Sequence, residues 1–267
     1  MEYIDSPANK KVKLAAALKQ RKQREKTGLF VAEGIRLCEM AAESDWSISY
    51  GLLTGQLTSQ PRGRDLTEKL SARGVPLYEV PEHIFAKAAG TDTPQGILLV
   101  MESKNPSLPS QKAGREKPLY VVMDGVQDPG NAGTIIRTAD AVGADGVIML
   151  KGSVDAFADK VVRSTMGSIF HVPVYAGISA AELQAFVQAQ DLQLLATALD
   201  ENAKPHFQQD FTRGTAVVLG NEGNGVSAEV LAMAQKTYIP MYGQAESLNV
   251  AMSAAIVLYE ALRQRRF

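Results

Sequence analysis

The sequence is poor in the residues that several kinds of site require. Its 267 residues include one cysteine, Cys38, which excludes disulfide frameworks and zinc sites built from thiolates. Three scattered histidines make a histidine metal centre unlikely on spacing, so no metal site is predicted. No run of about 18 apolar residues occurs, and the N-terminus lacks the apolar segment of a signal peptide. We therefore expect a cytoplasmic protein without a membrane span.

Two catalytic motifs are also missing. No G-K-[ST] occurs, which excludes a P-loop, and no G-x-S-x-G occurs, which removes the usual serine hydrolase. The glycines at 220, 223 and 225 are spaced G-x-x-G-x-G, whereas dinucleotide-binding folds use G-x-G-x-x-G. No clear acidic residue ends a following strand to hold a ribose. A nucleotide-dependent oxidoreductase is therefore the weaker enzyme hypothesis.

Charge is nearly balanced overall but uneven along the chain. The net charge of −1 does not indicate a nucleic-acid-binding protein, yet residues 10–26 carry eight lysines and arginines against one glutamate. Such a segment can neutralise RNA phosphates, or it can be an ordinary solvated helix face. Both interpretations stay open. The candidate RNA contacts in this basic arm are Lys10, Lys11, Arg21 and Arg24.

The pattern of apolar segments predicts two α/β domains. Residues 103–117 are polar, contain two prolines and lack periodicity, so they are predicted to link a domain over 1–102 to one over 118–267. Short helices and strands mix in the first domain. The second alternates strands with helices, and several strands are apolar throughout, as in a mostly parallel sheet covered on both faces. Strands are expected at 119–123, 146–150, 192–196, 216–219 and 238–240, and helices at 132–142 and 248–263.

Two polar loops follow strands in the second domain. One is the glycine-rich turn 219–227, which carries Glu222, and the other runs through 239–241 to 246–251. Loops at the carboxyl edge of a parallel sheet, with exposed backbone amides, form small-molecule pockets. Ser247 and Asn249 start the last helix, where Ser247 is a good cap and Asn249, at the second helical position, is the stronger site candidate.

A third motif precedes the helix expected at 132–142. Asn131 is its predicted N-cap, and the loop 128–133 offers amides to an anion. Arg137 lies off the apolar stripe of this helix, so its guanidinium is expected to face solvent, a cleft or a partner subunit.

These three motifs, at 124–139, 219–227 and 239–251, resemble in order and type the motifs of the SpoU/TrmH class of RNA 2′-O-ribose methyltransferases. The segments 30–34 and 91–97 resemble an L30e-like substrate-binding domain. The resemblance implies a C-terminal trefoil knot, a homodimer formed through the knotted domain, and S-adenosylmethionine as cofactor. Base rates alone favour an unknotted open sheet.

The resemblance also implies roles for individual residues. Arg137 corresponds to the proposed catalytic residue, with Asn131 near it and Glu222 orienting one of the two. Arginine is a poor base, so two roles are open: a perturbed general base, or a cation that holds a phosphate and stabilises the developing alkoxide. Glycine at 220 is expected to let the backbone approach the cofactor closely. The implied cofactor positions are Thr197, Ala198, Gly220, Ile239, Met241 and Leu248, and further candidate RNA contacts are Arg163 and Ser164.

The expected reaction is therefore methylation of a ribose 2′-hydroxyl in structured RNA. The basic segment and the L30e-like domain favour ribosomal RNA, with 23S rRNA as the expected substrate, and transfer RNA is the alternative substrate. A second hypothesis is a degenerate, non-catalytic RNA-binding protein. That hypothesis predicts loss of Arg137, Glu222 or Asn249, and all three are present.

Overall fold

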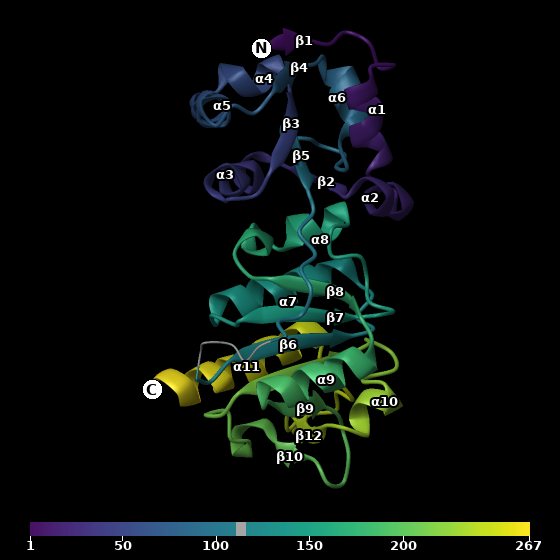
Figure 1. Cartoon of the computed structure of the whole chain (residues 1–267), viewed down its shortest axis with the longest axis vertical. Coiled ribbons are helices and arrows are strands. Elements are labelled where there is room, and N and C mark those ends of the chain that lie inside the picture. The colour runs from purple at the N-terminus through teal and green to yellow at the C-terminus, as the bar shows by residue number, and fades with distance from the viewer. Residues whose placement is uncertain (111–115) are drawn as a thin grey trace. The chain divides into compact units, whose positions relative to one another are not determined.

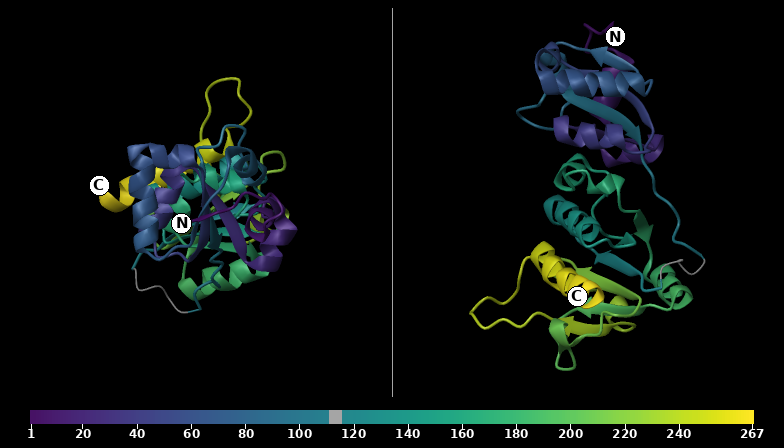
Figure 2. Two further views of the ribbon diagram at one scale, coloured as in Figure 1. Left: turned by 90° about the horizontal axis from the view of Figure 1, so that it is seen from above. Right: turned by 90° about the vertical axis from the view of Figure 1, so that its left-hand side faces the viewer.

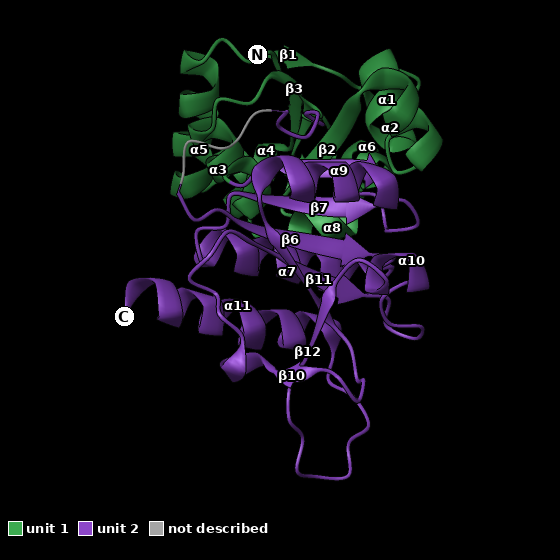
Figure 3. Cartoon of the chain, turned by 60° about the horizontal axis from the view of Figure 1, so that its bottom comes forward, with its two compact units in different colours: residues 1–104, 157–171 green, residues 105–156, 172–267 purple. Residues whose placement is uncertain are grey.

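The computed structural model describes residues 1–110 and 116–267, which form two compact units (Figure 3). Unit 1 comprises residues 1–104 and 157–171, and unit 2 comprises residues 105–156 and 172–267. The division differs from the predicted domains in two respects: the segment 157–171 packs with unit 1 although its sequence lies in the second predicted domain, and unit 2 begins at residue 105, within the predicted linker. Residues 111–115 of the predicted linker lie outside the described residues.

Unit 1 is a five-stranded mixed sheet in the order β1-β4-β3-β5-β2, with helices packed around it (Figure 1). Strand β5 pairs antiparallel with both of its neighbours, β2 and β3. The strands are β1 (Glu2–Tyr3), β2 (Leu29–Glu33), β3 (Ile48–Leu53), β4 (Leu77–Glu79) and β5 (Ile97–Glu102). The helices are α1 (Lys10–Ala17), α2 (Arg21–Thr27), α3 (Ile35–Glu43), α4 (Gly55–Ser59), α5 (Pro61–Ala72), α6 (Glu82–Ala88) and α8 (Asp159–Ser164), with the 3-10 turn η1 (Ser168–Phe170).

Aromatic packing explains why the segment 157–171 belongs to unit 1. The ring of Phe157 lies 5.0 Å from that of Phe30, and the ring of Phe170 lies 5.4 Å from that of Trp46, measured between centroids. Phe30 and Trp46 also meet edge to face at 5.9 Å. Burial of such rings stabilises by several kcal/mol, roughly 3–5 for each Phe→Ala change. The hydrophobic core of unit 1 is therefore completed by residues from the second half of the chain.

Unit 2 is a seven-stranded, all-parallel sheet in the order β10-β12-β9-β11-β6-β7-β8. Strands β6, β7 and β11 are buried at every residue, as their apolar sequences predict. The strands are β6 (Leu119–Asp124), β7 (Gly146–Leu150), β8 (Val174–Ile178), β9 (Gln193–Thr197), β10 (Lys204–Pro205), β11 (Thr215–Gly220) and β12 (Gln235–Tyr238). The helices are α7 (Pro129–Ala141), α9 (Ala180–Gln190), α10 (Ala228–Leu231) and α11 (Val250–Arg266), with the 3-10 turn η2 (His206–Gln208).

Helices cover both faces of this sheet. Leu183 and Phe186 of α9 and Val230 of α10 pack in one cluster with the strands on one face. Helices α7 and α11 pack against each other and against β6, β7 and β11. This is the mostly parallel α/β architecture expected from the sequence.

The first part of the predicted linker is attached to unit 2. The side chain of Asn105 accepts a hydrogen bond from the amide of Ala176 (2.9 Å) and donates one to its carbonyl (3.4 Å). The carbonyl of Pro109 accepts a bond from the buried side chain of Gln190 (3.1 Å), and Leu108 packs against the cluster under α9. This part of the predicted linker is therefore held against unit 2 at Asn105, Leu108 and Pro109.

Candidate active site

Parallel strands bring the predicted loops to one edge of the sheet. Strands β12, β9, β11 and β6 are neighbours in that order, so the loops that follow them are adjacent. The loop between β12 and α11 extends away from the sheet in the right-hand view of Figure 2. It is longer than expected, because β12 ends at Tyr238 and leaves Ile239 and Pro240, predicted as strand, in the loop. Proline has no N–H for the strand ladder, which accounts for the early end.

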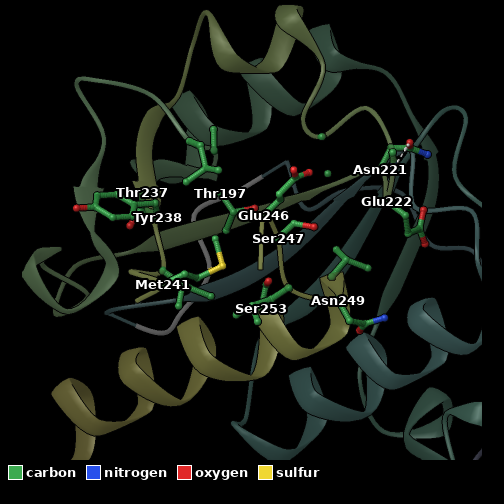
Figure 4. A pocket seen from close by; sticks show the side chains of 18 residues that line it. Thr197, Asn221, Glu222, Thr237, Tyr238, Met241, Glu246, Ser247, Asn249 and Ser253 are labelled. Carbon is green, nitrogen blue, oxygen red and sulfur yellow. Dashed lines mark hydrogen bonds between the residues drawn. The ribbon is translucent and has the colours of Figure 1, made fainter. Parts of the chain in front are cut away.

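A pocket of about 470 Å³ opens between these loops, within the usual range for small-molecule sites (Figure 4). All six positions predicted to bind the cofactor line it: Thr197, Ala198, Gly220, Ile239, Met241 and Leu248. Three of the predicted catalytic residues line it as well: Glu222, Ser247 and Asn249. The structure thus gathers nine predicted residues from three separate loops around one cavity.

Asn131 joins the three motifs although it does not line the pocket. Its Nδ2 donates to Glu222 Oε1 (3.0 Å), and its Oδ1 accepts from Nδ2 of Asn249 (3.0 Å). These residues lie 91 and 118 positions from Asn131 in the chain, so the contacts exist only in the fold. The amide therefore holds the second and third motifs in register with the first.

Glu222 accepts two more bonds, from the backbone amides of Gln127 (3.2 Å) and Asp128 (3.1 Å). Partial burial acts to raise the pKa of the Glu222 carboxyl, but the hydrogen bonds from Asn131 and from backbone amides outweigh it, so the pKa lies below its usual value. The group is therefore a carboxylate that orients the first motif. No described contact joins it to Arg137.

The turn that carries Glu222 is built by its neighbours. The Asn221 side chain accepts from the amides of Gly223 (3.0 Å) and Asn224 (2.9 Å) and donates to the carbonyl of Gly125 (2.8 Å). A Cβ on Gly220 would lie 2.2 Å from the backbone of Gly225. Glycine is therefore required at position 220 by the chain's own turn, and its close approach to a cofactor stays a prediction.

Two helix starts differ from the predictions. Helix α7 begins at Pro129 with Asp128 as N-cap, whose carboxylate accepts from the amide of Asn131 (2.8 Å). Helix α11 is capped by Asn249, which accepts from Ala251 (2.9 Å) and Met252 (3.3 Å), and not by Ser247. The side chain of Asn131 therefore does not cap α7 and instead bonds to Glu222 and Asn249, whereas the side chain of Asn249 both caps α11 and bonds to Asn131. The missed signal is Asp-Pro, since proline favours the first helical position.

Arg137 is exposed on α7, off the buried stripe of that helix, as expected. It does not line the pocket, and no hydrogen bond or ion pair joins it to any residue in the described ranges 1–110 and 116–267. Its guanidinium is therefore available to a ligand or to another chain. The structure does not bring it to the Asn131 network.

The candidate RNA contacts fall into two groups. Lys10 and Arg21 are exposed, and Lys11 is half-buried with its ammonium 4.6 Å from the ring centroid of Tyr78. Arg24 is a correction: it is 7% exposed and donates to the carbonyls of Leu18 (2.6 Å) and Lys19 (2.9 Å). Its guanidinium ties α1 to α2 and is not presented to RNA.

The second group lies on α8. Arg163 is half-buried and pairs with Asp159 (3.1 Å), and the hydroxyl of Ser164 donates to the carbonyl of Lys160 (2.7 Å). Both side chains reach the surface only in part, and their role in RNA binding stays a prediction. The basic arm is folded as α1 and α2 and is part of unit 1.

Two features are absent from the described residues. No group of three or more potential metal ligands occurs in the part of the chain that the structure describes. Among the same residues, no helix is both long enough and apolar enough to cross a membrane.

The pocket lining also includes residues that sequence analysis did not single out: Asn221, Glu246 and Ser253. The two side-chain acids of the lining, Glu222 and Glu246, belong to different loops.

Comparison with known proteins extends over nearly the whole chain. Residues 118–259 match the SpoU rRNA Methylase family, and residues 9–99 match the MRM3-like substrate binding domain. The 23S rRNA (guanosine(2553)-2'-O)-methyltransferase RlmP of Bacillus subtilis is 38% identical over 263 residues, covering 97% of this chain and 98% of the relative. The 23S rRNA (uridine(2479)-2'-O)-methyltransferase of Streptomyces viridochromogenes is 32% identical, covering 94% and 88%.

A solved structure agrees with both sequence matches. The AdoMet-bound rRNA methyltransferase from Sinorhizobium meliloti has a TM-score of 0.87 and 33% identity to this chain, covering 98% of this chain and 97% of that one. The shared architecture therefore includes both units.

Proposed function

The chain belongs to the SpoU rRNA methylase family, and we propose that it transfers a methyl group from S-adenosylmethionine to a ribose 2′-hydroxyl in 23S ribosomal RNA. The observation that carries this proposal is the convergence of three loops on one pocket, with Asn131 bonded to both Glu222 and Asn249. A nucleotide-dependent oxidoreductase has no comparable support. Neither does a degenerate binding protein, since Arg137, Glu222 and Asn249 are all present.

The pocket fits the cofactor in size and in the character of its lining. The proposed adenine contacts are backbone groups of Thr197, Gly220 and Leu248, with Ile239 and Met241 as apolar walls, and all five residues line the pocket. When bound, the cofactor supplies an electrophilic methyl group on a sulfonium. The chain's part is to hold that group and the ribose in line and to keep water out, which can contribute several kcal/mol through orientation alone.

Within the chain, Glu222, Asn131 and Asn249 act as a positioning network. Asn131 uses both ends of its amide, so its orientation is fixed by a donor on one side and an acceptor on the other. The charge-assisted bond to Glu222 is the stronger of the two. The network contacts the first turn of α7, the helix that carries Arg137.

Arg137 is proposed to act on the ribose or its phosphate. Two roles remain, general base or electrostatic stabiliser, and we prefer the second. Neutralising an arginine near pH 7 requires a pKa shift of roughly 6 units, or about 8 kcal/mol. A protonated guanidinium that stabilises the developing alkoxide needs no such shift.

The substrate is proposed to be 23S rRNA, because two relatives that match along most of the chain are named for that RNA. Residues 9–99 match a substrate-binding domain, and exposed Lys10 and Arg21 of this region can meet phosphates. Transfer RNA is the alternative.

A homodimer is proposed through the C-terminal domain. Met252, Ile256 and Tyr259 of α11 are 53%, 37% and 52% exposed and follow i, i+4, i+7 spacing, so they form one uncovered apolar stripe. Leu248 adjoins it at 38% exposure. Light scattering at micromolar concentration tests the dimer, and a monomer would contradict it.

A trefoil knot and a cytoplasmic location also stay predictions from the family.

The function is tested by mapping 2′-O-methyl groups in total RNA from a deletion strain. Loss of one site in 23S rRNA, restored by the wild-type gene, is the expected result. Loss in transfer RNA would identify the alternative substrate, and an unchanged map would contradict the proposal. Calorimetry with S-adenosylmethionine, with and without chelator, tests the cofactor; binding without any metal is expected.

A further inference from the structure

The pocket carries negative charge without any basic residue to balance it. Of the 18 lining residues, only Glu222 and Glu246 are charged at neutral pH, and none is lysine, arginine or histidine. A site with two carboxylates and no cation favours a ligand with positive charge. The two carboxylates differ in the hydrogen bonds that they already accept from the protein.

The charge of Glu222 is used within the chain. Its two oxygens accept three hydrogen bonds, from the side chain of Asn131 and from the amides of Gln127 and Asp128. These donors neutralise much of its field toward the pocket. Glu222 is consequently a positioning group, and it offers a ligand little that is not already committed.

Glu246, in contrast to Glu222, has no hydrogen-bond donor among the described residues. It lies in the loop between β12 and α11, next to Ser247, and its side chain is drawn among those around the cavity (Figure 4). It is exposed, and no residue of the described ranges 1–110 and 116–267 donates a hydrogen bond to it or pairs with it. A carboxylate that lines a pocket without a protein partner is available to a bound cation.

The bound cation follows from the proposed function, on which this inference rests. S-adenosylmethionine carries a positive sulfonium, an ammonium and a carboxylate. In the transfer, the bond between sulfur and the methyl carbon breaks, its electron pair stays on sulfur, and a bond forms between that carbon and the ribose oxygen, whose proton passes to water. The sulfur of the product, S-adenosylhomocysteine, is neutral. The ammonium and the carboxylate are unchanged.

We propose that Glu246 is a specificity-determining residue that makes the pocket prefer the sulfonium-bearing donor to its neutral product. The carboxylate attracts the sulfonium before transfer and loses that attraction afterwards, so it favours donor binding and product release. Because Glu246 is exposed, the effect is on the scale of a partly solvated ion pair, about two- to fivefold in affinity. It should weaken as ionic strength rises.

The test compares Glu246→Gln with the wild type in calorimetric titrations with three ligands: S-adenosylmethionine, S-adenosylhomocysteine and sinefungin, an analogue with an amine-bearing carbon in place of the methylsulfonium. We expect the variant to bind the two cationic ligands about two- to fivefold more weakly and the neutral product within about 1.5-fold. Glu246→Asp, which keeps the charge, should restore part of the preference. Glu229→Gln is the matched control, since Glu229 is exposed on α10 of the same unit and does not line the pocket.

Each other outcome is informative. Equal weakening of all three ligands would place the contact at the shared ammonium and overturn the proposal, and so would unchanged affinity for all three. A preference that does not decrease between low and high salt would also contradict it. If the wild type binds none of the ligands, the proposed function itself fails, and that result is distinct from a failure at Glu246.

Discussion

Replacing Asn131 by aspartate is the sharpest perturbation of the positioning network, because it changes one NH₂ group to an oxygen and almost nothing else. The new carboxylate can still accept from Asn249, as the amide oxygen does now across 3.0 Å. Toward Glu222, however, a donor at 3.0 Å becomes a second negative charge. The variant should therefore break the link between the first and second motifs and leave the link to the third.

The size of the effect follows from two contributions. A hydrogen bond to a charged group contributes about 1.5–3 kcal/mol. Two unit charges about 4 Å apart repel by about 1 kcal/mol in water and about 4 kcal/mol at an effective dielectric constant of 20. Because Glu222 is exposed, the lower repulsion applies, and the total is about 2.5–4 kcal/mol. The assembled site should become about 60- to 700-fold less populated.

This defect should depend on pH with a definite sign. Two adjacent carboxylates raise the pKa of the pair, because protonation of one relieves the repulsion. The penalty is therefore present above the raised pKa and is lost as pH falls through it. Cofactor affinity of Asn131→Asp should recover toward acidic pH, while that of the wild type should not show this rise.

Calorimetry with S-adenosylmethionine between about pH 5.5 and 8 measures the recovery, and single-turnover methyl transfer to RNA measures the catalytic loss. Asn224→Asp is the control, since it introduces the same charge at an exposed position of the same turn that does not line the pocket. Asn131→Ala removes both bonds without adding charge and should lack the acid recovery. Wild-type affinity and rate for Asn131→Asp at neutral pH would refute the network.

Three further predictions concern other parts of the molecule. Arg137→Ala should leave cofactor affinity within a few-fold and reduce single-turnover methyl transfer about 100-fold or more, and a near-full rate would remove Arg137 from the mechanism. For Arg137→Lys, partial activity with little pH dependence supports electrostatic stabilisation, whereas activity that rises steeply with pH supports a proton acceptor. Phe157→Ala should destabilise unit 1 by about 3–5 kcal/mol and change the fluorescence of Trp46, the only tryptophan, and an unchanged unfolding midpoint would contradict the shared core. The exposed lysines of α1 and α2 are Lys10, Lys13, Lys22 and Lys26. Neutralising them should weaken RNA binding and lower the salt slope of the binding constant by about 0.7–0.9 per lost contact, while cofactor affinity stays the same. An unchanged slope would mean that these lysines face solvent and do not contact RNA.

The pocket could be predicted because its residues follow strand ends. In a parallel sheet those ends share one edge, which predicts that the loops at Gly220 and Leu248 meet, whereas Thr197 was implied only by the resemblance to the family. The helix starts were less certain because aspartate and asparagine are equally good caps. Asp128 and Asn131 lie three residues apart, and only the proline at position 129 distinguishes them.

Other features depend on contacts that composition does not encode. Arg24 stands in a run of basic residues, but the turn after α1 leaves two carbonyls that need a donor, and this arginine is the one within reach. The segment 157–171 belongs to unit 1 because the rings of Phe157 and Phe170 pack against Trp46, which is more than a hundred residues away in sequence. Gly220 serves the chain's own turn, and a glycine in a motif does not tell which neighbour needs the space.

The central claim is that this pocket supports transfer of a methyl group to a ribose oxygen of ribosomal RNA. The most direct measurement incubates the purified protein with radiolabelled S-adenosylmethionine and with 23S rRNA from the deletion strain, then maps protection from alkaline cleavage, because a methylated 2′-oxygen cannot attack the adjacent phosphate. We predict one labelled nucleotide with a blocked cleavage, present with the wild type and lost with Asn249→Ala. Label on a base, or no label in 23S rRNA with fully folded protein, would contradict the account.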